Sequence, residues 1–416
     1  MSDRFPALRE RNFVLFISGH FLSLIGTAMQ NTAQPLLAYH LSNSRFDLGL
    51  IAFALTLPTF FLAIPGGVLV EHLEKRKAVI VAQTVMMLQA FLLAWLTFTD
   101  RVRIGHLVWL SLVLGIASTV EITARQAMLI ELAGPSALPN AIALQSMAFN
   151  LSRVLGPSLA AVFLLGVPGR GEAWIFLVNG FSFLFVVGGL LAIRNTHRDS
   201  AKHRSEIHFW KEAREGAAYL LRHPKIRRVV FLAGLMGLLA FPLVQQIPAI
   251  VKDILSSPGD PRSLVDARSS AIYTAQGFGA LTASLLLSIF STTLKDHERW
   301  AGIGQLAYLL GAMFIALAPP FPIALFLIAI MGWGSVTQLA LSNTIVQTNT
   351  PNGFRGRVFS IYLWAIQGIT PFGSLLIGYL AQTRGLSFTI LLVSAFCLGA
   401  MIAARIFERS GKRVEG

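Results

Sequence analysis

Long runs of apolar residues alternate with short polar stretches along the entire chain. Twelve of these runs hold about 18 residues or more, enough to cross a hydrocarbon layer of about 30 Å. Because lipid offers the backbone no hydrogen-bond partners, runs of this length predict helices. We therefore expect an all-α membrane protein with twelve transmembrane helices. The predicted spans are 12–39, 47–71, 78–98, 107–130, 139–166, 173–193, 227–251, 268–291, 300–318, 321–348, 357–381 and 386–408.

A polar and basic stretch separates the sixth predicted span from the seventh. It is too long for a hairpin loop, so it divides the chain into residues 1–195, a cytoplasmic linker at 196–226 and residues 227–416. Within the linker, "FWKEAREGAAYLL" (209–221) places apolar residues at helical spacing. This segment predicts either a helix on the inner surface of the membrane or a solvated connection.

The two halves of the chain resemble each other. The stretch from Pro135 to Pro157 aligns with the stretch from Pro351 to Pro371, and each has one proline in a loop and one inside the next helix. Internal repeats of this kind are typical of transporters built from two six-helix units about an axis along the membrane normal. The expected fold is therefore two pseudo-symmetric six-helix bundles.

The distribution of charge predicts how the chain is oriented. Hydrophobic residues make up 54% of the sequence and charged residues 13%, with a formal net charge of +14. With the N-terminus placed in the cytoplasm, 24 of the 34 Lys and Arg residues fall inside, 8 outside and 2 within helices. This bias follows the positive-inside rule. It predicts a multi-pass membrane protein with both termini cytoplasmic, and it explains the basic charge without a nucleic-acid partner.

A dense group of charges follows the second predicted span, in "GGVLVEHLEKRK" (66–77). It resembles the loop 2–3 signature of the major facilitator superfamily, Gly-x-x-x-Asp-Arg-x-Gly-Arg-Lys. The matching residues are Gly67, Glu71, His72, Lys75 and Arg76. The resemblance implies a gate that latches the two halves together in the outward-facing state. A short topogenic loop is the alternative, but it does not account for Gly67 or Glu71.

Further stretches resemble one branch of this superfamily. "FLSLIGTAMQ", "ITARQAMLIEL" and "NLSRVLGPSL" are similar to the branch of enterobactin exporters and macrolide-efflux proteins. The resemblance implies a secondary active exporter that exchanges protons for a small amphipathic solute, such as a drug or a siderophore, by alternating access. A lipid or lysolipid flippase, a proton-independent facilitator, and a non-transporting membrane sensor or scaffold are the alternatives.

Ionisable residues inside predicted spans are candidates for coupling, because a charge in the membrane is costly. Glu121 and Arg125 lie one helical turn apart, and they form either a structural ion pair or part of a proton relay. Arg153 suits an anionic substrate or Glu121 itself. His20 is expected to form hydrogen bonds or to titrate. Many members of the branch carry an acid where this chain has Thr27, so coupling is expected to depend on Glu121 or His20.

Uncharged amides inside the spans are candidates for the substrate cavity. Some of them are expected only to bond neighbouring helices. They are Gln30, Asn31, Gln34, Asn150, Gln245, Gln246, Gln276, Gln338, Asn343 and Gln367.

Motifs for catalysis are missing from the sequence. It has no phosphate-binding Gly-Lys-Ser/Thr loop, no His/Cys cluster with metal spacing and no Gly-x-Ser-x-Gly. The single cysteine, Cys397, excludes an internal disulfide. We therefore expect no enzyme activity, no cofactor and no metal, and a monomer whose partners are a small-molecule substrate, protons and the lipid bilayer.

Overall fold

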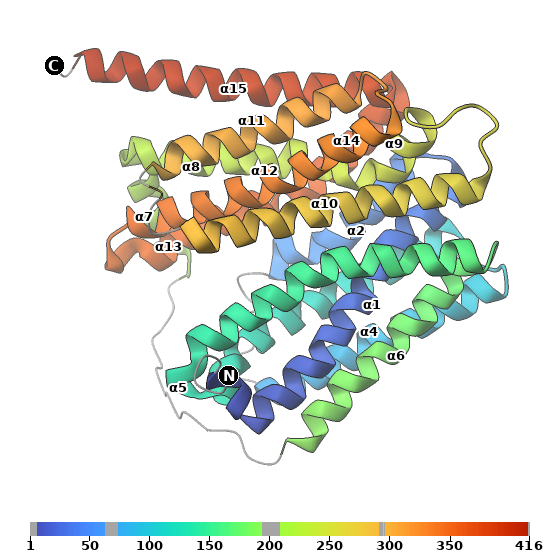
Figure 1. The fold of residues 1–416 in the computed structure, drawn as a ribbon. Coiled ribbons are helices and arrows are strands. Elements are labelled where there is room, and N and C mark those ends of the chain that lie inside the picture. The colour runs from blue at the N-terminus through green and yellow to red at the C-terminus, as the bar shows by residue number, and fades with distance from the viewer. Residues whose placement is uncertain (1–5, 63–73, 194–208, 291–293, 295, 415–416) are drawn as a thin grey trace. The chain divides into compact units, whose positions relative to one another are not determined.

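The structure is a computed structural model that describes residues 6–62, 74–193, 209–290, 294 and 296–414. Helices make up nearly all of this part of the chain, and no strand occurs in it (Figure 1). The chain forms two compact units. Unit 1 comprises residues 1–43, 54–204 and 259–274, and unit 2 comprises residues 44–53, 205–258 and 275–416.

The helices of the first half begin with a short 3₁₀ turn, η1, before the first long helix. Their bounds are η1 Pro6–Arg9, α1 Arg11–Ser42, α2 Arg45–Leu62, α4 Lys75–Phe98, α5 Ile104–Gly166 and α6 Gly171–Ala192.

The second half contains both long helices and spans assembled from several helical pieces. Their bounds are α7 Phe209–Arg222, α8 Pro224–Leu235, η2 Met236–Ala240, η3 Phe241–Gln246, α9 Ile247–Asp253, α10 Arg262–Phe290, α11 His297–Ile315, α12 Phe321–Thr348, α13 Asn352–Leu363, η4 Trp364–Gly368, α14 Thr370–Arg384 and α15 Leu386–Val414.

The twelve predicted spans are confirmed as helices. Ten continuous helical stretches in the described residues are long and apolar enough to cross a membrane. The 63-residue helix α5 holds two predicted spans, and α11, with 19 residues, corresponds to the ninth. The prediction that the chain divides at 195 and 226 stays a prediction.

Some predicted boundaries were wrong. The loop expected between spans 4 and 5 is reduced to a sharp break in α5 at Gly134, with φ 73° and ψ 161°. Glycine populates positive φ without steric cost, and Pro135 then continues the helix from its first turn. The second span was expected to reach residue 71; α2 is described as far as Leu62, and residues 63–73 lie outside the described residues, so this end of the span stays a prediction.

Two spans of unit 2 each contain a turn of π-helix. These turns are η2 (Met236–Ala240) and η4 (Trp364–Gly368), and they pack against each other. The hydroxyl of Thr370 donates a hydrogen bond of 3.1 Å to the carbonyl of Gly237. The seventh span was expected to be a regular helix, but after the π-turn it continues as the 3₁₀ segment η3 because Pro242 has no N–H to donate.

The helix expected in the linker is present as α7. It packs against α13, where Arg357 Nη1 lies 2.5 Å from Glu215 Oε2 and the Tyr219 and Phe354 rings stack at 4.8 Å. The segment is therefore anchored to unit 2. That α7 lies on the membrane surface stays a prediction.

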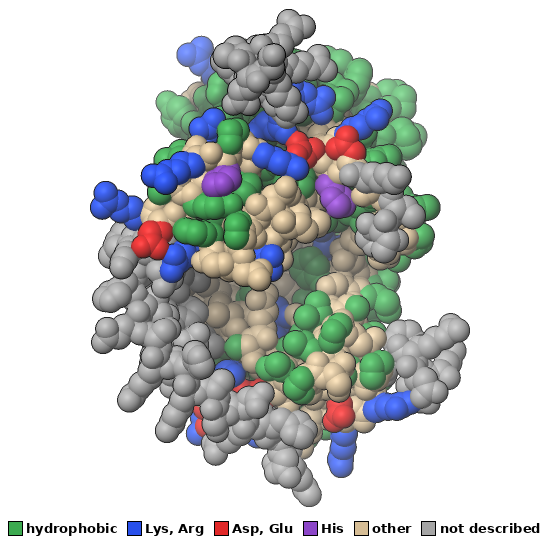
Figure 2. All heavy atoms as spheres, turned by 90° about the vertical axis from the view of Figure 1, so that its left-hand side faces the viewer, with side chains coloured by type: hydrophobic (Ala, Val, Ile, Leu, Met, Phe, Trp, Pro, Cys, Tyr) green, Lys and Arg blue, Asp and Glu red, His purple; other side chains and the backbone are tan. Residues whose placement is uncertain are grey.

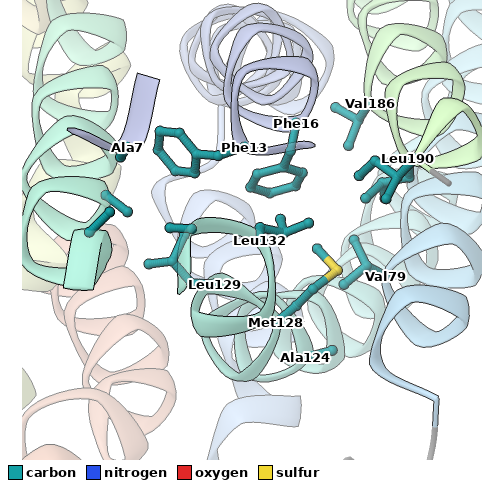
Figure 3. Packing of buried hydrophobic residues seen from close by; sticks show 14 of the residues in the cluster. Ala7, Phe13, Phe16, Val79, Ala124, Met128, Leu129, Leu132, Val186 and Leu190 are labelled. Carbon is teal, nitrogen blue, oxygen red and sulfur yellow. The ribbon is translucent and has the colours of Figure 1, made fainter. Parts of the chain in front are cut away.

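The core of unit 1 lies where α1, α4, α5 and α6 converge (Figure 3). Phe13 and Phe16 of α1 point toward Met128 and Leu132 of α5, with Leu190 of α6 on the other side. All five side chains are buried. This cluster fixes the rotation of each helix about its own axis. That rotation decides which polar residues, one turn further along the helices, face one another.

Close packing of α2 on α5 generates a stability prediction. A Cβ atom at Gly115 would lie 2.1 Å from the carbonyl oxygen of Leu55. We expect Gly115→Ala to destabilise the protein by about 1–3 kcal/mol, because the helices must separate. Thermal unfolding in detergent measures the effect. Gly188→Ala is the matched control, since nothing lies within 4 Å of a Cβ there. Equal melting temperatures for the two variants would contradict this packing.

Candidate functional site

A buried polar cluster lies between α4 and α5 of unit 1. Arg125 Nε lies 2.9 Å from Glu121 Oε1, so the pair suggested by the i, i+4 spacing is formed. The amide of Gln83 also donates to Glu121 Oε1, at 3.3 Å. Glu121 is 4% exposed and Arg125 9% exposed. The carboxylate therefore has two donors in an otherwise apolar surrounding. Sequence reasoning missed Gln83, which lies in an apolar helix with no charged neighbour to mark it.

His20 of α1 belongs to the same region. Its ring stacks on Phe16 with centroids 5.3 Å apart, and Phe16 belongs to the same core cluster as Ala124, the residue before Arg125. The side chain is buried, and neither ring nitrogen has a hydrogen-bond partner among the described residues. The hydrogen bonds that we expected His20 to form are therefore not seen among the described residues.

Several polar atoms of this cluster are buried and have no hydrogen-bond partner among the residues that the structure describes. They are both ring nitrogens of His20, Arg125 Nη1 and Gln83 Oε1. A buried polar atom left unsatisfied costs about 1–3 kcal/mol, so such atoms are rare unless something binds them. The cluster, which we call the inner polar cluster (His20, Gln83, Glu121 and Arg125), is therefore suited to accept a proton, a water molecule or a polar group of a solute.

Two of the predicted cavity residues serve a different purpose. Gln30 donates to Gln34 and to Gln89 of α4, both at 3.3 Å, and accepts from Asn179 of α6 at 2.7 Å. Gln34 donates to Ser111 of α5 at 2.6 Å. All five side chains are buried. Gln30 and Gln34 therefore join four helices, and the expectation that they line a substrate cavity finds no support here.

The remaining predicted amides are dispersed. Asn150 donates to the carbonyl of Ser146, and Asn343 accepts from Gln347, so both bond within their own helices. Gln246 donates to the carbonyl of Arg45 at 3.1 Å. The residues are Asn31 and Gln367 (exposed), Asn150, Gln245 and Asn343 (half-buried), and Gln246, Gln276 and Gln338 (buried).

Unit 2 contains a cavity of about 380 Å³. Gln338 of α12 and Gln305 of α11 line it, each with a buried polar atom that has no hydrogen-bond partner among the described residues. Arg228 pairs with Glu298 at its wall, and Arg405 also lines it. The cavity therefore combines amides with charges of both signs. Gln338 is one of the predicted amides, and its role in binding a substrate stays a prediction; Gln305 was not predicted, since its only signal was an amide inside an apolar helix.

The structure describes only part of the expected gate. Gly67, Glu71 and His72 lie outside the described residues. Lys75 Nζ lies 2.6 Å from Glu131 Oε1 of α5, and Arg76 Nη2 donates to the carbonyl of Leu191 at 3.3 Å. Both basic side chains thus tie the start of α4 to other helices of unit 1.

Arg153, the other charged candidate, lies apart from these acids. Its guanidinium carbon is 6.0 Å from the centre of the Phe149 ring, and the side chain is half-buried. Within the described part of the chain it makes no ion pair with a carboxylate. Of the two roles suggested for Arg153, pairing with Glu121 is therefore wrong for this structure.

One group of side chains has the chemistry of metal ligands. Atoms of His40, Glu172 and Asp266 lie within 4.8 Å of one another. Arg262, however, pairs with both carboxylates. Its guanidinium supplies the positive charge that a cation would bring, so we interpret the group as an ion-pair cluster.

Comparison with known proteins identifies relatives over the full chain. The profile of a family described as transmembrane secretion effector matches residues 2–412. The multidrug efflux pump Tap of Mycolicibacterium fortuitum is 24% identical over 377 residues, covering 89% of each chain. The enterobactin exporter EntS of Escherichia coli O1:K1 is 23% identical, covering 98% of this chain and 95% of its own.

Solved structures share the fold. A bacterial homologue of the human lysosomal transporter Spinster, in an inward-facing and unoccupied conformation, has a TM-score of 0.71 at 15% identity, covering 96% of this chain and 97% of its own. The nucleoside transporter NupG has a TM-score of 0.72 at 12% identity, covering 95% and 98%. The twelve helices, the polar groups buried among them and the family match converge on one conclusion: this chain belongs to the transmembrane secretion effector family, non-enzymatic membrane transporters of the major facilitator superfamily.

Proposed function

We propose that the protein is a secondary active exporter of a small amphipathic solute, driven by exchange with protons. The observation that carries this proposal is the inner polar cluster. There Glu121, the acid well inside a long helix, is paired with Arg125, and four neighbouring polar atoms are unsatisfied. The names of the relatives, an efflux pump and an enterobactin exporter, support the direction of transport.

In this proposal, proton exchange at Glu121 would act through the attraction between Glu121 and Arg125. A proton on the carboxyl group removes its charge, and with it the attraction that holds Arg125 at 2.9 Å. The guanidinium is then free to bind a polar group of the solute. Solute and proton thereby compete for the same pair of side chains, which is what antiport requires. Arg153, with no carboxylate partner in the described residues, would serve an anionic group of the solute.

The cavity in unit 2 supports a solute of moderate size. Its volume of about 380 Å³ falls within the range of about 300–1,000 Å³ that is typical of small-molecule sites. Gln305 and Gln338 offer amide groups, and Val229, Leu232 and Met401 offer apolar surface. Such a lining suits an amphipathic molecule better than a uniformly polar one.

We further propose the bacterial inner membrane as the location, with both termini in the cytoplasm and the protein acting as a monomer. The count of Lys and Arg on the two sides supports this orientation. On the face drawn in Figure 2, which is the side of α7 and α13 in Figure 1, many Lys and Arg side chains are visible.

The stretch from Gly67 to Arg76 is proposed to act as the cytoplasmic gate, as its resemblance to the superfamily signature implies. Lys75 and its partner Glu131 support this role, because their ion pair joins the start of α4, at the end of the motif in the sequence, to α5 three residues before its break at Gly134. Opening the gate would require that pair to separate or to move as one piece.

Substitution of Glu121 tests the coupling. In inverted vesicles, we expect the native protein to accumulate ethidium or enterobactin when the lumen is acidic. Glu121→Gln should abolish accumulation against a gradient but preserve downhill exchange, because the amide cannot carry the proton. Glu121→Asp should keep part of the coupled activity.

The same substitution at an exposed position, Glu10→Gln, is the matched control and should transport normally. Full proton-dependent accumulation by Glu121→Gln would reduce Glu121 to a structural partner of Arg125. Failure of the native protein to accumulate either probe would overturn the proposed class of solute.

Reporter fusions test the orientation independently of transport. Fusions after residues 44, 103, 170, 260, 320 and 384 should report the outside, and one after residue 205 the inside. A cytoplasmic signal at 260 would contradict the proposed topology, whatever the solute.

A further inference from the structure

A second group of charges, two buried carboxylates with His40 and the more exposed Arg262, lies at the opposite end of α1 from the inner polar cluster's His20. It contains His40, at the end of α1, Glu172, in the first turn of α6, and Arg262 and Asp266, in the first two turns of α10. All four belong to unit 1. We call them the outer charge cluster. Beyond Thr274, the remainder of α10 belongs to unit 2, so the cluster holds a helix that both units share.

Each ring nitrogen of His40 lies next to a different carboxylate. Nδ1 is 3.3 Å from Glu172 Oε1, and Nε2 is 3.1 Å from Asp266 Oδ1. Arg262 pairs with Glu172, and its Nε lies 3.7 Å from Asp266 Oδ2. The exposed fraction is 13% for the His40 side chain, 3% for Glu172 and 6% for Asp266. The two carboxylates are thus shielded from water, and each lies next to both His40 and Arg262.

The charges around His40 favour a proton on its ring. A neutral imidazole carries one N–H and one lone pair, so it can donate to only one of the two carboxylates and repels the other. The imidazolium ion donates from Nδ1 to Glu172 and places its positive charge beside Asp266 Oδ1, which has no hydrogen-bond partner among the described residues. With His40 charged, two positive groups balance two carboxylates. Without that proton, one negative charge remains buried and uncompensated, and an uncompensated buried charge is strongly destabilising.

Within the described residues, no other charged group accounts for the balance. The groups that act on the ring are Glu172 from α6 and Asp266 and Arg262 from α10. The described part of α5, which also packs against α1, places no charged side chain against the ring. Arg268, further along α10, is paired with Asp260 at 2.8 Å. His40 is therefore the member of the cluster whose protonation decides its net charge.

We propose that His40, held by Glu172, Asp266 and Arg262, is a proton-binding site on the extracellular side, and that the bound proton closes the outer end of the transporter. The proton comes from external water and occupies a ring nitrogen of His40. In the exporter proposed above, an acidic exterior would close this end once the solute has left. The inference rests on the proposed orientation, but on no particular solute.

Cysteine labelling tests closure without a transported substrate. Ser270 lies one turn deeper along α10 than Asp266, is fully buried and makes no hydrogen bond through its hydroxyl in the described residues. In a Cys397→Ser background, Ser270→Cys provides a single reporter thiol. A membrane-impermeant thiol reagent is applied from outside to intact cells, in EDTA, between about pH 5.5 and 8, the range over which histidine ordinarily titrates.

We expect labelling of the reporter to accelerate on the order of tenfold as the pH rises, because loss of the proton weakens the closed form. Gly105→Cys, exposed near the start of α5, corrects for the reagent's own pH dependence. His40→Gln should label rapidly at every pH. His40→Lys, which keeps a positive charge, should label slowly across the range.

Two further variants test whether the pH dependence comes from the outer charge cluster. His106→Gln, at an exposed histidine near the start of α5, should retain the native pH profile. Glu172→Gln should flatten the profile, which provides a second variant if His40→Gln does not fold.

Other outcomes would overturn the proposal. A native profile in His40→Gln would assign the pH dependence to another group. Slow labelling that requires added zinc and disappears in EDTA would assign the cluster to a metal ion. Labelling of the reporter from the cytoplasmic side alone would instead contradict the orientation, and would leave Gly105→Cys unlabelled from outside as well.

Discussion

The cost of burying charge in an apolar chain governs where this protein places its polar residues. An ionised group in the membrane must have a partner of opposite charge or donors that replace water. Glu121 has Arg125 and Gln83, and Glu172 has His40 and Arg262. The inner polar cluster and the outer charge cluster thus compensate buried carboxylates near opposite ends of unit 1. Each cluster therefore balances its carboxylates with neighbouring cations or amide donors in place of water.

Neutral polar residues follow a related rule with a different result. Gln30 and Gln34 form hydrogen bonds to Gln89, Asn179 and Ser111, so most of the polar atoms in this group find their partners within the group. Such bonds contribute about 0.6 kcal/mol each on average in membrane proteins, but together they fix the rotation of four helices. A network of this kind specifies structure, whereas the inner polar cluster, with its unsatisfied atoms, is better suited to binding.

The sequence predicted the fold far better than it predicted contacts. Twelve apolar runs became twelve spans because length and composition alone decide whether a segment can cross lipid. The Glu121–Arg125 pair could also be predicted from the sequence, because residues four apart in a helix lie one turn apart on the same face. His40, Glu172 and Asp266 were not, since they meet only after helices distant in sequence pack together.

The role of Gln30 was equally hidden, because it depends on the rotation of α1 rather than on its sequence. Pattern alone does not distinguish an amide that faces a cavity from one that faces a neighbouring helix. The π-turns at Met236–Ala240 and Trp364–Gly368 were missed for a similar reason: one additional residue in a turn leaves hydropathy unchanged.

The two facing π-turns have a mechanical consequence. A wide turn interrupts the regular i to i−4 ladder, so the helix is locally softer in bending than the α-helical segments on either side. Because η2 and η4 are in contact, and Thr370 joins them through Gly237, their soft points coincide. When one of these two spans bends at its π-turn, the other would bend at the same place. Unit 2 would then flex about one shared axis through η2 and η4, and the two spans would not bend independently.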